Sequence, residues 1–565
     1  MDDVIRKNAL INAVSHKGAA TAGPVISKIM GEFPEARKNA KDLMPKVQAI
    51  VDEVNAMGYE AQKAMLEQMG GDDHQKKAQV KKRLPELEGA QNGLVMRFAP
   101  GPSGPLHIGH SRACILNDEY CKLFNGKFIL RFEDTNPEKI ELDAYKMIPE
   151  DLDWLGIKVH ETFIQSDRMD IYYEHARKLL EMGHAYICKC DVEVWRELKL
   201  KQTPCPHRDL EPSIQLEEWD RLLSGHYTQG EASFMVKTDL HHNNPAVRDF
   251  VGMRVMTDPP HPRHGSKYIV YPLYNYSVAI DDHLMGCTHV LRGKDHLNNT
   301  FRQEYVYDHF GWKRPLFYHY GFVSIDDVIL KKSKIKEAIH SGYFGGWDDV
   351  RLGTFRALKR RGISPDALRE YWVNVGLKQV DIKFAFENLY SYNKAIIDPV
   401  SSRYFFVSEP QTVVVETDVA IEGRAPKLPD NKEKGYREYR LEPKDHAVEL
   451  LARKGDLADL TPGQIFRFKD LCNVSLKEAA ANGVKAKYEG NDIKVARSGA
   501  KIIQWVPKEG SIPTELVLPT GEIIHGFAEK AVFDEPLEIV QFERVGFVRI
   551  EDRTPQLIKA VYTQN

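Results

Sequence analysis

The sequence contains few cysteines and no long apolar run, and each shortage excludes a class of protein. Only seven of its 565 residues are cysteine, which is too few for the disulfide framework of a small secreted domain. No apolar run approaches the roughly 18 residues of a membrane helix, and the N-terminus lacks the basic start and apolar stretch of a signal peptide. We therefore expect a cytoplasmic protein that does not bind a membrane.

The sequence also lacks an excess of charge of either sign. Lysine and arginine number 78 against 81 aspartates and glutamates, which leaves a formal net charge of −3. Overall electrostatics therefore does not indicate a nucleic-acid partner. Basic residues do gather locally, in "KKAQVKKR" (76–83) and "RALKRRG" (356–362), although each run taken alone is more typical of a solvated helix face.

The length and the changing pattern along the chain indicate several domains. A chain of 565 residues is too long for one hydrophobic core and suggests about three to five domains. The first 90 residues or so follow a helical pattern, with apolar side chains on one face between Val47 and Met57. Beyond residue 400, many short strand-like runs separated by turn signals are typical of β-barrels or sandwiches.

A strand–helix–strand unit stands at the start of the middle region. The runs "GLVMRFAP" (93–100) and "KFILRFED" (127–134) are short and apolar, as buried strands are, and a helical stripe lies between them. This order predicts a βαβ unit and therefore a parallel sheet. Strand-like runs follow at 267–282 and 314–325, and the stretch 185–270, rich in Pro, Gly, His and Cys, is predicted to be an insertion.

The turn between the first strand and the helix carries two histidines in "GPSGPLHIGHSRA" (101–113). A helix N-terminus attracts phosphate through its unpaired N–H groups and its dipole, and Gly104 and Gly109 let the backbone approach a bulky ligand. His107 and His110 are three residues apart and lie on one side of the first turn, where they can donate hydrogen bonds to phosphate oxygens. On its own, the pattern also fits a structural histidine pair.

Two further signals lie at predicted strand ends. Glu133 and Asp134 follow the second strand, at the edge of a parallel sheet where ligands bind, and suit a cationic group. The segment "LKKSKI" (330–335) is predicted to be a short cationic loop that could hold a departing pyrophosphate. Taken alone, each signal also fits an ordinary solvated surface.

The insertion contains a metal-ligand pattern. Cys188-x-Cys190 is followed after fourteen residues by Cys205-x-His207, and these include three of the seven cysteines. Two close pairs of such ligands suit tetrahedral zinc, and a site without an open position would be structural. The alternative is a set of buried cysteines without a metal.

Together these motifs resemble the class I aminoacyl-tRNA synthetases, and within them the glutamyl- and glutaminyl-tRNA synthetase subfamily. The resemblance covers about 95–560 and is carried by "RFAPGPSGPLHIGHSRA", "RFEDTNP", "WLGI", "QSDR", "YPLYNYSVAIDDHLMGCTHVLRGKDH" and "KKSKI". The β-rich last third is similar to the archaeal and eukaryotic branch. More loosely, residues 1–90 are similar to the helical N-terminal extension of archaeal-type glutamyl-tRNA synthetases.

The resemblance implies an α/β fold with a Rossmann-type class I synthetase core, an inserted acceptor-binding domain, a helical N-terminal extension and C-terminal β-barrel domains. The implied divisions are the extension (1–90), the first half of the Rossmann core (91–184), the inserted acceptor-end-binding domain with the zinc site (185–270), the second half of the core (271–344), a helical stem-contact domain (345–397) and a β-barrel anticodon-binding region (398–565).

The resemblance also implies roles for single residues. It places Arg97 against the substrate carboxylate, Glu133 against the α-ammonium, Tyr274 in the side-chain pocket and Arg292 against the γ-carboxylate of glutamate. A buried guanidinium that faced a neutral amide would lose about 3–5 kcal/mol, which favours glutamate over glutamine. The implied catalytic residues are His107, His110, Lys331 and Lys334; the implied ATP-binding residues are Pro100, Gly104, His107, Gly109, His110, Ser333 and Lys334.

The implied activity is ATP-dependent ligation of glutamate to tRNA through glutamyl-adenylate, with Mg²⁺ beside ATP and a structural Zn²⁺. The expected partners are tRNA(Glu), L-glutamate and ATP, and tRNA(Gln) remains open as a second RNA substrate. We expect a monomer whose N-terminal extension docks a protein partner.

Several departures from the family pattern keep alternatives open. Asn136 is typical of glutaminyl members, Lys332 and Ile335 depart from the K-M-S-K-S signature, and Gly101 replaces a serine of the bacterial glutamyl enzymes. The first alternative is therefore a glutaminyl-tRNA synthetase. A small-molecule nucleotidyltransferase, such as a cytidylyltransferase, and a non-catalytic synthetase-like RNA-binding protein are the others.

Overall fold

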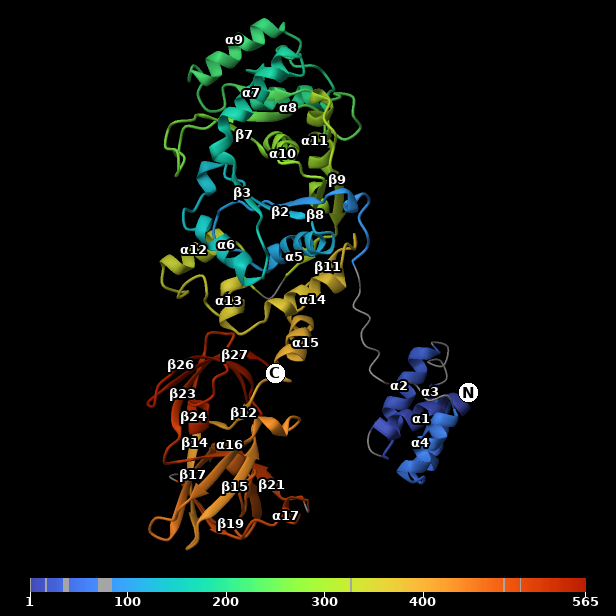
Figure 1. The fold of residues 1–565 in the computed structure, drawn as a ribbon, viewed down its shortest axis with the longest axis vertical. Helices are drawn as coiled ribbons and strands as arrows, with labels where there is room; N and C mark the ends of the chain where they lie inside the picture. Colours follow the sequence, from blue (N-terminus) through green and yellow to red (C-terminus); the bar gives the residue numbers. More distant parts are fainter. Residues whose placement is uncertain are drawn as a thin grey trace. The chain divides into compact units, whose positions relative to one another are not determined.

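A computed structural model describes residues 2–15, 18–33, 40–69, 84–325, 328–480, 483–497 and 499–565. It divides into two compact units, Met1–Lys82 and Arg83–Asn565, and Figure 1 shows the elements of each. The whole basic run 76–83 lies outside the described residues. Within the described part, no helix is both long and apolar enough to cross a membrane.

The N-terminal unit is helical, as predicted. Its helices are α1 (Asp2–Ser15), α2 (Ala22–Glu32), α3 (Ala40–Asn55) and α4 (Tyr59–Gln68). The predicted stripe on α3 is buried at Val47, Ile50, Val51 and Val54, which pack with apolar residues of α1 and α2. Met57 lies beyond the end of α3. The side chain of Gln62 is buried and donates to the carbonyls of Gly18 and Val54, so it joins the ends of three helices.

The larger unit begins with a parallel sheet. Strands β1, β2 and β3 pair in that order, all parallel, and β8 pairs in parallel with β9. The Thr288 N–H donates to the Val95 carbonyl at 3.0 Å, so β8 begins beside β1. Helix α5 packs against β1, β2 and β8 (Figure 1). The bounds are β1 (Val95–Phe98), α5 (Ile108–Leu123), β2 (Lys127–Phe132), α6 (Ala144–Trp154), β3 (Glu161–Ile164), α7 (Met169–Glu181), α10 (Tyr274–Leu284), β8 (His289–Gly293), α11 (Leu297–Phe310) and β9 (Leu316–Tyr320).

An antiparallel sheet of four strands lies between β3 and β8 in the sequence. Its order is β4-β5-β6-β7, and its core includes Trp219, Phe234 and Tyr276. The elements are β4 (Ala185–Cys188), α8 (Val192–Leu200), α9 (Pro212–Leu223), β5 (Ser233–Val236), β6 (Phe250–Val255) and β7 (Val270–Pro272).

The sequence prediction of a strand-like run over 267–282 was wrong for most of its length. Only Val270–Pro272 is a strand, and the chain then forms α10. Residues 275–282 of that helix are all buried. A helix that is buried on every side shows no amphipathic period, so its apolar run resembles a buried strand.

Short helices follow the parallel sheet. The predicted loop 330–335 instead contains a helix start, since Lys331 is the N-cap of α12 and Ser333 and Lys334 lie in its first turn. The elements are β10 (Val323–Ser324), α12 (Lys332–His340), α13 (Phe355–Arg360), α14 (Pro365–Val375), β11 (Ile382–Lys383) and α15 (Phe386–Ile397).

The last third is β structure, as predicted, in two seven-stranded sheets and a two-stranded ribbon. The sheet orders are β12-β25-β26-β27-β23-β24-β13 and β21-β18-β19-β20-β14-β17-β22, and β15 pairs with β16. Buried Arg437 of the ribbon forms ion pairs with Glu529 and Glu543. The elements are β12 (Arg403–Tyr404), β13 (Phe406–Ser408), β14 (Pro410–Glu416), β15 (Ile421–Pro426), β16 (Tyr436–Leu441), β17 (Ala447–Arg453), α16 (Lys454–Leu457), β18 (Ile465–Phe468), β19 (Asn473–Ala480), β20 (Gly483–Tyr488), α17 (Lys494–Arg497), β21 (Lys501–Ile503), β22 (Trp505–Pro507), β23 (Ile512–Val517), β24 (Ile523–Ala528), β25 (Ile539–Phe542), β26 (Gly546–Arg553) and β27 (Ile558–Gln564).

Candidate active site and metal-ligating cluster

The two histidines of the first turn cap α5 and hold each other. The His107 backbone N–H donates to Nδ1 of His110 at 3.2 Å, and the Gly109 N–H donates to Nδ1 of His107 at 3.1 Å. Because each Nδ1 accepts a hydrogen bond from a backbone N–H, a neutral ring must carry its own proton on Nε2. Burial, assisted by the charge of Lys332, lowers the pKa of His107 to about 3, and burial also lowers the pKa of His110. Both rings are therefore neutral Nε2–H donors at pH 7.

Neighbouring rings pack so closely against two glycines of this turn that a side chain at either position would be crowded. Gly104 has φ +127°, and a Cβ there would lie 3.2 Å from the ring of Trp347. A Cβ on Gly109 would lie 2.9 Å from the ring of His107. The turn can therefore be this tight only with glycine at both positions.

Lys332 and Asp151 hold the turn by hydrogen bonds to its backbone. Lys332 donates from Nζ to the Gly104 carbonyl at 3.1 Å, and Asp151 accepts the Leu106 N–H at 2.7 Å. Burial lowers the pKa of Lys332 to about 8 and raises the pKa of Asp151 to about 7. A lysine in the first turn of α12 thus contacts the histidine turn. It is Lys332, and not the expected Lys331 or Lys334.

Lys331, Ser333 and Lys334 are exposed. Among the described residues, none of these three side chains is recorded in a hydrogen bond or ion pair. These three residues flank Lys332, which contacts the turn, and their exposed side chains are free to contact a ligand.

A cavity of about 440 Å³ opens at the carboxyl ends of β1 and β8. This is the edge at which ligands bind in parallel sheets. Of the residues predicted for ATP, Pro100, Gly109 and His110 line the cavity; of those predicted for the amino acid, Arg97, Tyr274 and Arg292 line it. Glu133 lies at the border, where its N–H donates to the Pro100 carbonyl at 3.1 Å.

The floor of the cavity rests on a buried ionic network. One carboxylate oxygen of Asp282 accepts from Arg97 Nε at 3.1 Å and from Arg131 at 2.6 Å. Arg131 also donates to Glu133 at 3.1 Å. Asp282 and Arg131 have fully buried side chains, and the two arginines keep the pKa of Asp282 low against the effect of burial. Because Arg97 bonds here through Nε, its terminal nitrogens remain available to the cavity.

The two carboxylates after β2 have different environments. Burial raises the pKa of Glu133, and Arg131 opposes the shift. Asp134 is buried and accepts from the Ser166 backbone and hydroxyl and from the Tyr145 hydroxyl. Of this predicted pair, only Glu133 remains a candidate for a cationic ligand, while Asp134 stabilises the loop.

Arg292 is a buried cation that has no carboxylate partner among the described residues. It is 5% exposed, and its guanidinium donates to Tyr274 at 3.3 Å, to Thr300 at 2.6 Å and to Gln303 at 2.9 Å. All three acceptors are neutral, and burial lowers the pKa of Arg292. A buried charge without a counter-charge is costly, so an anion in the cavity would be strongly favoured.

The four predicted metal ligands converge in the antiparallel sheet region. The ligand atoms of Cys188, Cys190, Cys205 and His207 all lie within 4.8 Å of one another, and Cys205 Sγ lies 3.4 Å and 3.3 Å from the other two sulfurs. A tetrahedral zinc with Zn–S bonds of about 2.3 Å holds sulfurs about 3.8 Å apart. The donor set and its spacing therefore fit a metal of this kind, and none of these cysteines forms a disulfide.

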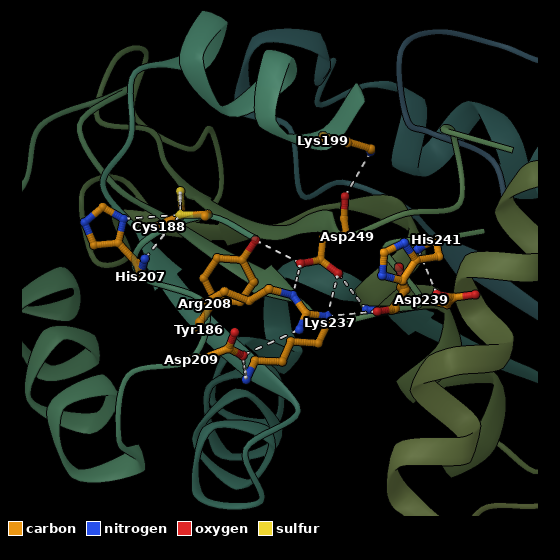
Figure 2. A network of polar contacts seen from close by, with 12 residues as sticks. Tyr186, Cys188, Lys199, His207, Arg208, Asp209, Lys237, Asp239, His241 and Asp249 are labelled. Carbon is orange, nitrogen blue, oxygen red and sulfur yellow. Dashed lines mark hydrogen bonds and ion pairs between the residues drawn. The ribbon is translucent and has the colours of Figure 1, made fainter. Parts of the chain in front are cut away.

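Figure 2 shows how this cluster is tied to the sheet beside it. Arg208, next to the candidate ligand His207, donates from Nε to the buried carboxylate of Asp249 at 2.8 Å. The same carboxylate accepts from Tyr186 of β4 at 3.0 Å, and the Asp249 carbonyl accepts from Lys199 of α8 at 2.9 Å. The loop that carries His207 is thereby fixed to two neighbouring elements.

Sequence reasoning does not indicate the roles of several supporting residues. Asp282 could have been found from the sequence. It forms an acidic pair with Asp281 in the otherwise apolar run of α10, and buried carboxylates need hydrogen-bond partners. The sequence marks Lys332 only as a departure from the K-M-S-K-S signature, and its partial burial and its contact with Gly104 are seen only in the structure. Thr300 and Gln303 follow Arg292 by eight and eleven residues and carry no motif.

Comparison with known proteins identifies related sequences over nearly the whole chain. A family model described as "tRNA synthetases class I (E and Q), catalytic domain" matches residues 93–399, and models of the anti-codon binding domain of the same group match 401–491 and 502–551. The chain is 46% identical to a "Glutamate--tRNA ligase" of Pyrococcus furiosus over 567 residues and to one of Methanocaldococcus jannaschii over 558 residues. Each alignment covers 98% of both chains.

We expect Asp282→Asn to lower the stability of the cavity floor by about 3–5 kcal/mol, because two buried guanidiniums lose their shared counter-charge. Hydrogen exchange of backbone amides in β1, β2 and α10 measures this change. Asp308→Asn is the matched control, since Asp308 pairs with Arg314 on the surface and should contribute less than about 1 kcal/mol. Equal protection in the two variants would contradict the role of Asp282.

Proposed function

Because the chain belongs to the class I tRNA synthetases of the E and Q group, we propose that it attaches glutamate to tRNA in an ATP-dependent reaction. E and Q are the one-letter codes of glutamate and glutamine. Support for glutamate comes from the relatives that are similar over nearly the full length and carry the name glutamate–tRNA ligase. It also comes from the chemistry of the cavity.

The observation that carries the choice of amino acid is the buried, unneutralised guanidinium of Arg292. A γ-carboxylate would supply the missing counter-charge, whereas the neutral amide of glutamine would not. Leaving a buried charge without its partner costs about 3–5 kcal/mol, and every 1.4 kcal/mol corresponds to about a tenfold ratio. The difference is sufficient to favour glutamate over the alternative, a glutaminyl enzyme.

The rest of the amino acid fits the remaining charges. Arg97, with its terminal nitrogens free, meets the α-carboxylate, and Glu133 meets the α-ammonium. The Tyr274 hydroxyl accepts a hydrogen bond from Arg292, so its own proton is available for the side chain of the substrate. The three groups would hold the reacting carboxylate in one orientation, which is a large part of catalysis by proximity.

The first step is attack of a glutamate α-carboxylate oxygen on the α-phosphorus of ATP. The new P–O bond forms as the bond to pyrophosphate breaks, and glutamyl-adenylate results. No protein nucleophile takes part. His107 and His110 donate Nε2–H to phosphate oxygens as negative charge grows there, and Lys331 and Lys334 hold the departing pyrophosphate. Pro100, Gly104, Gly109 and Ser333 shape the ATP site, and Mg²⁺ accompanies ATP.

In the second step, a hydroxyl of the terminal adenosine of tRNA attacks the glutamyl carbonyl and AMP leaves. By analogy with its class the hydroxyl is the 2′-OH. We assign the parallel strands β1–β3 and β8–β9 to a Rossmann-type core and β4–β7 to an inserted domain that meets the acceptor end. The helices over 345–397 would contact the RNA stem, and the β-sheets beyond 398 would bind the anticodon, where unstacked bases are accessible. The RNA would be tRNA(Glu), with tRNA(Gln) as the alternative.

We also propose that the four-residue cluster holds one structural zinc. Cys188, Cys190, Cys205 and His207 would occupy all four tetrahedral positions, so the metal would have no open position for catalysis. The metal would keep the segment between β4 and α9, which includes α8, folded beside the inserted sheet.

Replacement of Arg292 by alanine tests the choice of amino acid. We expect kcat/KM for glutamate to fall by a factor that corresponds to about 2–5 kcal/mol, because the γ-carboxylate loses its charge partner. Glutamine should lose much less, so the ratio of the two should move towards unity. The ratio is measured by ATP–pyrophosphate exchange with tRNA present, and Arg314→Ala, at an exposed arginine, serves as control. An unchanged ratio would show that Arg292 does not face the side chain.

Substitutions of His107 and Lys334 by alanine test the phosphate contacts. Each should lower kcat of adenylate formation about tenfold or more while glutamate binding changes little, because both residues act on charge that appears in the transition state. His340→Ala, at the exposed end of α12, should behave as wild type. Exchange rates near wild type in both test variants would reject the assignment.

Metal analysis of the purified protein tests the zinc site. We expect about one zinc per chain, lost in the double variant Cys190→Ser, Cys205→Ser and kept in Cys472→Ser, whose cysteine is buried elsewhere. In the double variant, transfer to tRNA should suffer more than adenylate formation, since the cluster lies outside the cavity. Wild-type protein free of metal would refute the proposal.

A further inference from the structure

We infer that Gln303 and Thr300 are specificity-determining positioning residues, which hold Arg292 with neutral acceptors and so reserve its positive charge for the substrate. This inference rests on the proposed function. It differs from the role of Arg292 itself, because it concerns the groups that leave the arginine unneutralised.

Both residues act on the same nitrogen of the guanidinium. Arg292 Nη2 donates to Thr300 Oγ1 at 2.6 Å and to Gln303 Oε1 at 2.9 Å. Thr300 and Gln303 lie one turn apart on the buried face of α11, at 6% and 1% exposure. The acceptors are therefore fixed by the helix and are not mobile surface groups.

Other groups around the guanidinium do not neutralise it either. His319 lies opposite Arg292 on the neighbouring strand, and burial with the charge of Arg292 lowers its pKa to about 4. It is therefore neutral at pH 7. Asp295, which also lines the cavity, is exposed and lies beside His296. On the other side, the guanidinium carbon lies 5.1 Å from the centre of the Phe317 ring.

Within the described part of the chain, the contact between Gln303 and Arg292 leaves a buried nitrogen of each side chain without a hydrogen bond. Among the residues that the structure describes, Nε2 of Gln303 has no hydrogen-bond partner, and neither does Nε of Arg292. A glutamate at position 303 would have the same shape and would bond Arg292 as an ion pair, which is about twice as strong as a hydrogen bond between neutral groups. The chain instead has a neutral acceptor with the same reach. This arrangement is costly for the free protein and useful only if an anion arrives.

The experiment is a matched pair of substitutions, Gln303→Glu and Gln303→Met, assayed by ATP–pyrophosphate exchange with tRNA and either glutamate or glutamine. In Gln303→Glu the internal carboxylate satisfies Arg292, so kcat/KM for glutamate should fall about 100-fold or more, mostly through KM. Glutamine should change by no more than about threefold, because its amide never used the charge. In Gln303→Met one acceptor is lost without a new charge, so glutamate should fall less than about tenfold and remain preferred.

Three outcomes overturn the inference: a glutamate-to-glutamine ratio in Gln303→Glu like that of wild type, an equal loss of the ratio in Gln303→Met, or a loss in kcat alone. Thermal melting checks the fold. If Gln303→Glu does not fold, Thr300→Asp places a carboxylate beside the same Nη2, with Thr300→Val as its control, and is judged by the same ratio. A wild-type protein that does not use glutamate would contradict the proposed function instead, so the two failures are distinguishable.

Discussion

The shared contact of Asp282 with Arg97 and Arg131 is the interaction on which the cavity depends. It joins β1, β2 and α10 through one carboxylate oxygen that is completely buried. Without it two guanidiniums would repel each other inside the fold. With it, Arg131 can hold Glu133, and Arg97 keeps its terminal nitrogens for the cavity. A stabilising ion pair and the orientation of two side chains at the cavity therefore have the same physical origin.

The three arginines around the floor of the cavity differ in how far acidic side chains neutralise their charge. Arg131 is fully neutralised by acidic side chains, Arg97 is partly neutralised, and Arg292 is held only by neutral groups. The degree of neutralisation falls from the interior towards the cavity. Charge is therefore left uncompensated where an anionic ligand would compensate it, and the pairing of each arginine, more than its presence, indicates its role.

The sequence allowed the order of elements and the main motifs to be predicted, but not the contacts that support them. The strands around Arg97 and Glu133, the turn with His107 and the four candidate metal ligands follow from local patterns, because each depends on residues close together in the chain. The helix α10 was mistaken for a strand, since burial on every side removes its period. The contacts of Lys332 with Gly104 and of Asp151 with Leu106 join residues far apart in sequence. A single sequence carries no local signal for such contacts.

The same reasoning explains why the turn uses two histidines where two lysines would supply more charge. The rings of His107 and His110 have centroids 3.9 Å apart, so two cations there would repel strongly in a partly buried site. Lys332 and the N-terminus of α5 already provide positive charge close by. Burial, assisted by the charge of Lys332, keeps both rings neutral, and the backbone hydrogen bonds to Nδ1 fix their protons on Nε2. The turn can therefore offer two oriented donors to a phosphate without carrying two further charges. Burial is the main cause of the neutral rings, and Lys332, which holds the turn, reinforces it.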